Sequence, residues 1–432
     1  MSKAFLPHEQ SRKVAFVASI YGHFGAFHLP YMELLQQHGC EVHAYAQPGQ
    51  ERERLERLGV VCHDVPISRS PLQAGNWRAL GLLTESFRTE KFQLVHVHTP
   101  VASFLGRIAA RRASVPCTMY TAHGFHFYAG APLLNWLLYY PLERLLARWT
   151  DILITMNGED WERSLKFPVR RKAVYVPGVG LDLGVYGGGS PGSPGSLSCP
   201  GGGAPSADEK AEAWQALGLP QLAEEPDACV VLCIAELNAN KNQRQLVEAL
   251  GRIRAEAGSA RGLQLVLAGT GPSEPELLAL AERLGVRDRV HALGFRRDIP
   301  ALLRACDAAA LVSYREGLPR AVMEAMAAGK PVIGTRIRGI RDLIADTATG
   351  WLVPVGDAGA TADALRRLRD DPVHARAMGE AGRERIKGFG LPAVLREMEA
   401  LYIEALDAKP TAPAQAAPDS GSSVGPAGHE PA

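Results

Sequence analysis

Two runs of alternating strand and helix patterns constrain the fold of this chain more than any other feature. The first run begins with the apolar stretch 13–20, KVAFVASI, and the second with 228–236, ACVVLCIAE. In each run, short apolar stretches alternate with segments whose apolar residues have helical spacing. Such alternation favours a parallel sheet that is covered by helices on both faces. We therefore predict two α/β halves, each built around a doubly wound, Rossmann-like sheet.

A segment rich in Gly, Ser and Pro separates the two runs. Residues 184–206 read GVYGGGSPGSPGSLSCPGGGAPS, a composition that cannot bury a core. The length of 432 residues suits two domains, and ligands of two facing doubly wound domains bind in the crevice at the strand ends. We predict an N-terminal domain at 1–183, a linker or insertion at 184–225, a C-terminal domain at 226–390, a helix at 391–407 and a disordered tail at 408–432.

Charge and cysteine usage exclude several classes of function. The net charge of +1 argues against a nucleic-acid partner. Seven cysteines without CxxC spacing indicate a reducing compartment, with no disulfide framework and no zinc site. Because the chain has no apolar leader and no stretch of about 18 uninterrupted apolar residues, we expect a cytoplasmic protein. Residues 1–180 carry a net charge of +6, which is either chance or a surface for an anionic partner such as a membrane.

The stretch 315–330, REGLPRAVMEAMAAGK, contains two glutamates eight positions apart. We place Glu316 on the loop after a strand, and Glu324 on the second turn of the helix that follows Pro319. The amides of Gly317 and Leu318 would point outward at the helix N-terminus, where they can bind phosphate or polyol oxygens. Both glutamates can accept hydroxyl donors from a ligand. The alternative is that they are solvated charges at a helix end.

Other candidate residues follow the ends of other predicted strands. Lys241 in ELNANKNQ could reach an anion, and Gly271 in AGTGP allows a ligand to approach the backbone. Phe295 could stack on a base. Each has an ordinary alternative, namely a solvated lysine, a turn and core packing. Their convergence on one edge of a parallel sheet favours a binding site.

The first half offers a histidine, a glycine-containing loop and an aromatic segment. His123 follows a strand in TAHGFHFYAGAP, and Gly22 and Gly25 lie in the predicted loop YGHFG after the first strand. Each could be purely structural, or could face a phosphate site. The segment 132–149, PLLNWLLYYPLERLLARW, either packs in the core or dips into a membrane interface.

Missing motifs narrow the chemistry further. The sequence has no Asp-x-Asp motif for a metal bound to a sugar nucleotide, so we expect no metal and no cofactor. It has no GxxxxGK[ST] loop, which argues against an ATPase or kinase of that type. A nicotinamide-dependent enzyme is the alternative, but no GxGxxG follows KVAFVASI.

The stretch EGLPRAVMEAMAAGKPVIGT resembles the Glu-x7-Glu signature of retaining glycosyltransferases of family 4, which have the two-domain GT-B fold. The likeness covers about residues 13–405 and includes VPGVGLDL, ELNANKNQ, LVLAGTGP, LGFRRDIP and GIRDLI. The first-half run HTPVASFLGRIAAR resembles the subgroup that builds capsular, exopolysaccharide and lipid-linked glycans. The fold implied by the resemblance is GT-B, two facing Rossmann-like domains with an interdomain cleft.

The resemblance implies roles for the glutamate stretch and for the lysine. Glu316 would contact hydroxyls of the donor sugar, helped by the amides of Gly317 and Leu318, and Glu324 would bind the ribose hydroxyls. Lys241 would neutralise the diphosphate. Many members carry an arginine five residues before this lysine, where the present chain has a glutamate.

The same resemblance implies the rest of the site. Gly271 and Phe295 would border the nucleoside, and His123 would lie across the cleft near the transferred sugar. The glycine loop at Gly22 and Gly25 would approach the β-phosphate, although it lacks the paired Gly-Gly that is common in the family.

We therefore expect a retaining, metal-independent hexosyltransferase that uses a UDP-sugar. Its partners would be a nucleotide-sugar donor and a glycan or polyprenyl-diphosphate-linked acceptor for surface polysaccharide, at the inner face of the membrane. The alternative is a non-catalytic protein of the same fold that binds nucleotide sugars.

Overall fold

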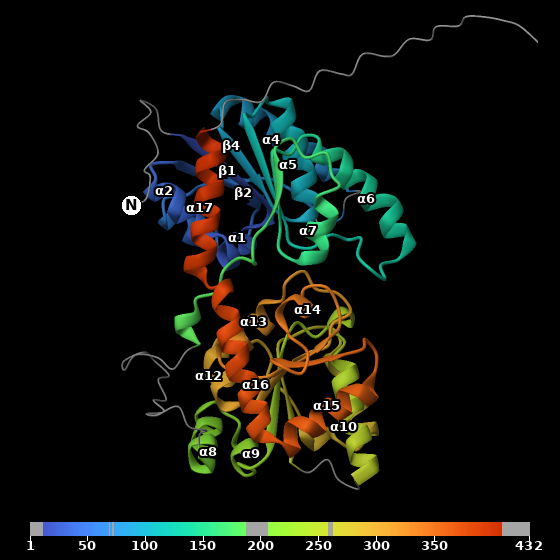
Figure 1. The fold of residues 1–432 in the computed structure, drawn as a ribbon. Coiled ribbons are helices and arrows are strands. Elements are labelled where there is room, and N and C mark those ends of the chain that lie inside the picture. Colours follow the sequence, from blue (N-terminus) through green and yellow to red (C-terminus); the bar gives the residue numbers. More distant parts are fainter. Residues whose placement is uncertain (1–11, 69, 71–72, 187–205, 258–261, 408–432) are drawn as a thin grey trace, which may run out of the picture.

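The chain folds into two facing α/β halves joined near one side (Figure 1). The computed structural model describes residues 12–68, 70, 73–186, 206–257 and 262–407. The predicted fold class is confirmed, because each half contains one parallel sheet with helices on both faces. Among the described residues, no helix is long and apolar enough to cross a membrane.

The N-terminal half is built on a seven-stranded sheet with the order β3-β2-β1-β4-β5-β6-β7, in which neighbours are parallel. Its first strand pairs with two others, and Val14 lies opposite both Val42 and Leu94. The strands are β1 (Lys13–Ile20), β2 (Glu41–Gln47), β3 (Val61–Asp64), β4 (Leu94–Val97), β5 (Cys117–Ala122), β6 (Ile152–Thr155) and β7 (Lys172–Tyr175).

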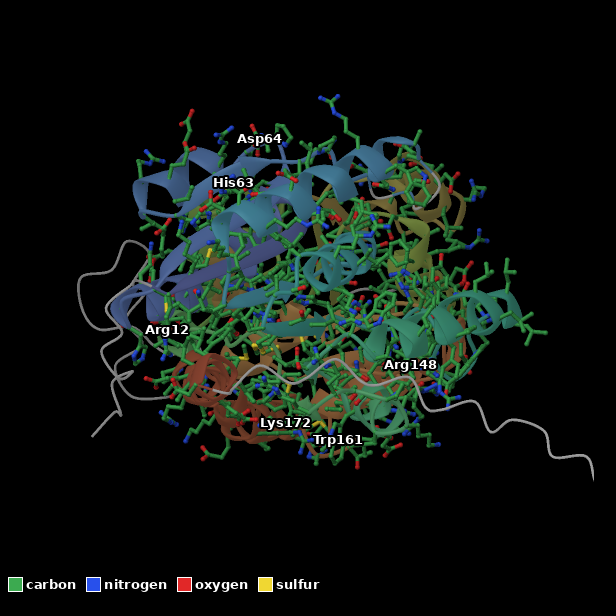
Figure 2. The ribbon with its side chains drawn as sticks, turned by 90° about the horizontal axis from the view of Figure 1, so that it is seen from above. Arg12, His63, Asp64, Arg148, Trp161 and Lys172 are labelled. Atoms are coloured by element: carbon green, nitrogen blue, oxygen red, sulfur yellow. The ribbon has the colours of Figure 1, made fainter. Side chains whose placement is uncertain are left out.

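Alternate residues of β1 face opposite layers of helices, as the period of a strand requires. Val14 and Phe16 join one apolar cluster, while Ala15 and Val17 join the other. Figure 2 shows the two edges of this sheet, with His63 and Asp64 on one side and Lys172 on the other. The helices are α1 (Tyr21–Phe27), α2 (Leu29–Gln37), α3 (Arg52–Arg57), α4 (Gly75–Glu90), α5 (Pro100–Arg112), α6 (Leu133–Ala147) and α7 (Gly158–Ser164), followed by the short 3-10 helix η1 (Leu183–Val185).

The C-terminal half repeats the same plan with a six-stranded parallel sheet in the order β10-β9-β8-β11-β12-β13. Its strands are β8 (Cys229–Ile234), β9 (Leu263–Ala268), β10 (Val290–Ala292), β11 (Ala308–Leu311), β12 (Val332–Thr335) and β13 (Gly350–Val353). Its α-helices are α8 (Ala207–Ala216), α9 (Pro220–Ala223), α10 (Gln243–Ala257), α11 (Glu274–Arg283), α12 (Ile299–Ala305), α13 (Arg320–Ala327), α14 (Ile340–Leu343), α15 (Ala358–Asp370) and α16 (Pro372–Arg385), and its 3-10 helices are η2 (Ala239–Lys241), η3 (Arg287–Arg289) and η4 (Ile386–Phe389).

The second part of the predicted linker is folded, which corrects the boundary at 184–225. Ser206 and Glu209 form a capping box that starts α8, and this satisfies amides at the helix N-terminus. Trp214 is 1% exposed and packs with Leu219 and Leu222 under the C-terminal sheet. The polar surface of this segment masked the signal of these apolar residues. The remainder of the predicted linker, 187–205, and the predicted tail, 408–432, lie outside the described residues.

The last helix, α17 (Leu391–Asp407), leaves the C-terminal half and packs on the N-terminal half beside α2 (Figure 1). Val394, Met398 and Tyr402 are buried in the same apolar cluster as Phe16. The hydroxyl of Tyr402 lies 3.0 Å from Nδ1 of the buried His96. The N-terminal half is thus completed by the end of the described chain.

Candidate active site

The carboxyl ends of the strands of both sheets meet where the two halves face each other. Lys241 is the last residue of η2, which follows β8, and Glu316 lies on the loop after β11, the strand adjacent to β8. Their side chains form an ion pair, with 2.6 Å between Nζ and Oε1. The loops are tied together because Asn240 Nδ2 donates to the carbonyl of Arg315, and the amide of Tyr314 donates to the carbonyl of Asn240. The sequence thus correctly predicted that these two residues converge.

Glu324 lies on the second turn of α13, with only 8% of its surface exposed. Its Oε1 accepts hydrogen bonds from the hydroxyl of Tyr186 (2.9 Å) and from Nε of Arg320 (2.8 Å). Burial and this carboxylate raise the pKa of Tyr186, which keeps the phenol a donor. The alternative of a freely solvated Glu324 is therefore wrong. The prediction did not foresee Tyr186 and Arg320 as its partners.

Gly317 and Leu318 bring the two halves into direct contact. A Cβ on Gly317 would lie 1.7 Å from the carbonyl oxygen of His123, so only glycine fits there. A Cβ on Gly339 would likewise lie 2.0 Å from the carbonyl oxygen of Gly317. Leu318 packs against Gly178, whose φ is +80°. A Cβ added to Gly178 would lie 2.9 Å from Cδ2 of Leu318. At this point the predicted cleft is closed by backbone contact.

His123 follows β5 and joins a cluster of histidines from the N-terminal half. Nε2 of His123 lies 3.2 Å from Nε2 of His23. Nε2 of His23 also lies 3.2 Å from Nε2 of His28. Burial holds the pKa of His123 well below its usual value and lowers that of His23 to about 4. These imidazoles are therefore neutral near pH 7.

The segment YGHFG is not a loop but the start of α1, which corrects the prediction for Gly22 and Gly25. Helix α1 begins directly at the end of β1, so its first amides point toward the site. A Cβ on Gly22 would meet only Ile20, at 3.7 Å. A Cβ on Gly25 would lie 2.6 Å from a carboxylate oxygen of Glu51. Glycine at 25 thus makes room for the neighbouring loop.

Gly271 lies beside the loop that leads to Lys241, and Phe295 follows β10, which is two strands away from β8 in the sheet. A Cβ on Gly271 would lie 2.2 Å from the carbonyl oxygen of Leu237, which explains the glycine by close packing of two loops. Phe295 is 70% exposed, and the guanidinium of Arg297 lies 5.8 Å from its ring centroid. Core packing of Phe295 is therefore excluded, and its ring face is accessible to a ligand.

An arginine that the sequence analysis did not single out joins the halves. Arg338 is 4% exposed, and its guanidinium donates to Oδ1 of Asp160 (2.7 Å) and to the carbonyl of Phe125 (2.8 Å). Its Nε donates to the carbonyl of Glu316 (3.2 Å). Arg338 therefore fixes the loop of Glu316 against the N-terminal half. A basic residue just after the strand PVIGT was the available signal.

Further contacts between the halves surround this arginine. An ion pair joins Arg341 and Glu159 (2.8 Å). The amide of Gly158 donates to Asp342 (3.1 Å), and Nη1 of Arg320 donates to the carbonyl of Ala26 (3.2 Å). Because these contacts involve α1, α7, α13 and α14, they hold the carboxyl ends of the two sheets in a fixed position relative to each other.

A large apolar cavity opens beside the histidine cluster. Its volume is about 920 Å³, and it runs between α4, α5 and α6. One end reaches Ser19, His23 and Gly124 at the strand ends. Of its polar lining residues, Glu143 accepts a hydrogen bond from Nη2 of the buried Arg107 at 2.8 Å. Its apolar wall includes Phe27, Trp77, Leu80, Val101, Phe104, Leu105, Ile108, Leu142 and Leu146.

Helix α6 does not pack in the core over its whole surface. Leu133, Leu134, Leu137 and Leu138 are each more than half exposed, whereas Tyr140 and its aromatic neighbours pack inward. The interpretation of 132–149 as a core segment is therefore wrong for one face. This face of α6 therefore exposes four leucines to solvent.

Two family matches cover both halves of the chain. Residues 219–385 match the family described as glycosyl transferases group 1, and residues 29–178 match the glycosyl transferase 4-like domain. The chain is 36% identical over 401 residues to the putative glycosyltransferase EpsD of Bacillus subtilis, covering 92% of this chain and 98% of that protein. It is 29% identical to the UDP-Gal:alpha-D-GlcNAc-diphosphoundecaprenol alpha-1,3-galactosyltransferase of Escherichia coli, covering 76% of this chain and 79% of that one.

Solved structures support the same architecture. Anabaena Alr3699/HepE in complex with UDP-glucose superposes with a TM-score of 0.70 at 20% identity, over 91% of this chain and 100% of that one. WaaG, a glycosyltransferase involved in lipopolysaccharide biosynthesis, superposes with a TM-score of 0.65 at 19% identity, over 90% and 99%. Full-length similarity to EpsD, the two family matches and the paired parallel sheets agree, and the chain therefore belongs to the group 1, family 4 glycosyltransferases, as a hexosyltransferase-type enzyme with the GT-B fold.

Proposed function

We propose that the chain transfers a hexose, with retention of configuration, from a UDP-sugar to a lipid-linked glycan acceptor in surface polysaccharide synthesis. The observation that carries this proposal is the apolar cavity that ends at the strand edge where the two halves meet. The printed activity of the E. coli relative, which uses UDP-galactose and a diphosphoundecaprenol-linked sugar, supports it. The complex of the Anabaena structure with UDP-glucose supports the choice of nucleotide.

The cavity suits the hydrocarbon part of such an acceptor. Each buried CH₂ group stabilises the complex by about 0.8 kcal/mol, so a chain segment of a few isoprene units would bind well in this apolar volume. Gly124 lies at the cavity end and also approaches Gly317. A Cβ added to Gly124 would lie 3.1 Å from the Cα of Gly317. A lipid held in the cavity would thus present its sugar to the loop of Glu316.

The donor would bind on the C-terminal side without a metal at the diphosphate. Lys241 would turn from Glu316 to the diphosphate, whose charge it neutralises together with amides at helix N-termini. Glu316 would then accept hydroxyls of the sugar, while Glu324 would accept ribose hydroxyls beside Tyr186.

The transfer itself needs no protein nucleophile in this proposal. The bond between the anomeric carbon and the diphosphate oxygen breaks, and the acceptor oxygen forms a bond to the same face of that carbon. The acceptor proton passes to the departing phosphate oxygen, so atoms and charges balance. The close approach of the halves at Gly317 would exclude water and so protect the donor from hydrolysis.

The leucine face of α6 would contact the membrane that supplies the acceptor. Arg144 lies on the same helix, and Arg148 directly follows it. In Figure 2, Arg148 lies along the same edge of the N-terminal half as Trp161 and Lys172. Leucines flanked by cations are typical of a peripheral surface for anionic lipids.

Turnover tests the proposed reaction. The purified protein is assayed with single UDP-sugars and an undecaprenyl-diphosphate-linked sugar, without added Mg²⁺ or Mn²⁺. We expect UDP release that matches product formation, with an axial anomeric bond retained in the product NMR spectrum. Binding of UDP-sugar without turnover on any acceptor would favour the non-catalytic alternative instead.

Filling the cavity tests the acceptor site separately. Val101→Trp places a large ring in the cavity wall. We expect a raised KM for the long-chain acceptor and an unchanged KM for the UDP-sugar. An unchanged KM for both substrates contradicts the lipid assignment.

Liposome co-sedimentation tests the membrane contact. The double variant Leu134→Glu and Leu138→Glu should lose binding to anionic vesicles, whereas Val373→Glu, an exposed apolar site on α16, should retain it. Equal binding of both variants would remove α6 from the proposal.

A further inference from the structure

Four histidines from separate segments of the N-terminal half gather at the strand ends. His23 lies in α1, His28 follows that helix, and His98 and His123 follow β4 and β5. One ring nitrogen from each lies within 4.8 Å of one nitrogen of every other. His28 and His98 are 1% and 0% exposed. No step of the proposed transfer uses this cluster as a whole.

The spacing of the nitrogens is that of metal ligands. Nε2 of His23 lies 3.2 Å from Nε2 of His28 and 3.2 Å from Nε2 of His123. In a tetrahedral zinc site with Zn–N distances of 2.0–2.1 Å, ligand nitrogens lie about 3.3 Å apart. The two measured distances therefore match the edges of such a tetrahedron.

Hydrogen bonds alone do not account for these contacts. An imidazole nitrogen carries either one hydrogen or one lone pair. Nε2 of His23 can therefore form one well-directed hydrogen bond, although two ring nitrogens, those of His28 and His123, lie close to it. In addition, Nδ1 of His28 and both ring nitrogens of His98 are buried without a hydrogen-bond partner among the residues that the structure describes. Such groups cost free energy unless something binds them.

The surroundings of the cluster also allow an ion to reach it. His23 lines the apolar cavity, which gives an access path from solvent. A second group of candidate ligands, Glu41, His43 and Glu90, differs because Lys13 already supplies a positive charge 2.6 Å from Glu90.

We propose that His23, His28, His98 and His123 bind one transition-metal ion that prefers imidazole ligands, with Zn²⁺ as the first candidate. The ion fixes α1 to the ends of β4 and β5, and so holds the backbone of His123 against Gly317. This site is separate from the diphosphate, which the proposed function leaves without a metal. It also departs from the sequence-based expectation of no metal, which considered only Asp-x-Asp and cysteine patterns.

Metal binding is measured without any sugar transfer, so its outcome is independent of the proposed function. The full-length protein is stripped with a chelator, refilled with Co²⁺ or Zn²⁺ and freed of excess ion. We expect about one ion per chain, and for Co²⁺ the intense visible absorption of tetrahedral nitrogen coordination. His28→Gln and His98→Gln should each abolish both signals. His291→Gln, which alters a half-buried histidine of the C-terminal half paired with Gln264, is the matched control and should retain them.

X-ray absorption of the zinc-loaded wild type removes the dependence on folded variants. A first shell of nitrogen at about 2.0 Å supports the proposal. A shell dominated by oxygen or sulfur overturns it, as does failure of the wild type to retain either ion. Retention of a full equivalent by both cluster variants overturns it as well.

Discussion

Replacing Arg338 by methionine should destabilise the protein strongly, because this side chain joins the two halves from a buried position. Methionine keeps most of the volume but removes the charge and all donors. The loss leaves the carboxylate of Asp160, which is 0% exposed, without its 2.7 Å partner. The carbonyls of Phe125 and Glu316 lose hydrogen bonds too.

The magnitude follows from the burial of the pair. Removing one partner of a buried ion pair costs about 3–5 kcal/mol, since the other charge stays buried and uncompensated. Two further hydrogen bonds from a charged donor keep the expected loss near the top of that range, at about 4–5 kcal/mol. Arg336→Met is the matched control, because its side chain is 54% exposed and pairs with Asp346 on the surface. Exposed pairs contribute about 0–1 kcal/mol.

The assay is urea denaturation followed by circular dichroism and by tryptophan fluorescence, so that a separate transition of one half becomes visible. Asp160→Asn and the double variant complete a mutant cycle with Arg338→Met. We expect the double variant to lose at least about 2 kcal/mol less than the sum of the single variants. If Arg338→Met and Arg336→Met differ by less than about 1 kcal/mol, the assignment of Arg338 as a buried link is refuted.

Three other changes probe the site. Lys241→Ala should lower kcat/KM for the UDP-sugar by about 10²–10³, as measured by steady-state UDP release; a loss under threefold contradicts its role. Gly317→Ala should abolish transfer, since the new Cβ would lie 1.7 Å from the carbonyl oxygen of His123. Gly81→Ala is the control: the new Cβ meets open space inside α4, and the free energy of unfolding should rise by about 0.5–1 kcal/mol. Burial first, then nearby arginines, lowers the pKa of His126 to about 4, so the unfolded state binds more protons between pH 6.5 and 4 and stability falls as the pH falls. His126→Gln should reduce this acid-induced loss by about 1–3 kcal/mol in urea titrations at pH 7 and 4.5, and identical pH dependence of both proteins would contradict the assignment.

The periodicity of the chain was sufficient to predict the two sheets and the position of Glu316. Strands such as β1 and β8 are buried on both faces, so their sequences are almost continuously apolar and easy to identify. A residue just after such a strand lies at the carboxyl edge by geometry alone. Lys241 and Glu316 therefore converge as expected, although nothing in their spacing predicted a direct ion pair.

Contacts between distant segments were beyond the reach of sequence patterns. Arg338 and Asp160 are 178 positions apart, and neither lies in a motif with an obvious partner. The four histidines come from α1, the residue after it and the ends of β4 and β5, and they have no common spacing. The short helix α1 was mistaken for a loop because its two glycines and aromatic residues are poor helix formers. Its helical form depends on packing, with Tyr21 and Phe24 fully buried.

The course of the chain around α17 has a mechanical consequence. Residues 176–183 leave the N-terminal half, and residues 389–391 return to it directly alongside, with hydrogen bonds from Leu181 to Phe389 (3.1 Å) and from Leu391 to Leu181 (2.8 Å). The two crossings lie on one side of the molecule (Figure 1). Two hydrogen-bonded segments of this kind can act as a hinge axis, which resists twisting and sliding of the halves but permits rotation about it. We therefore expect the two halves to open by rotation about this axis, with the largest displacement at the contacts that lie farthest from it.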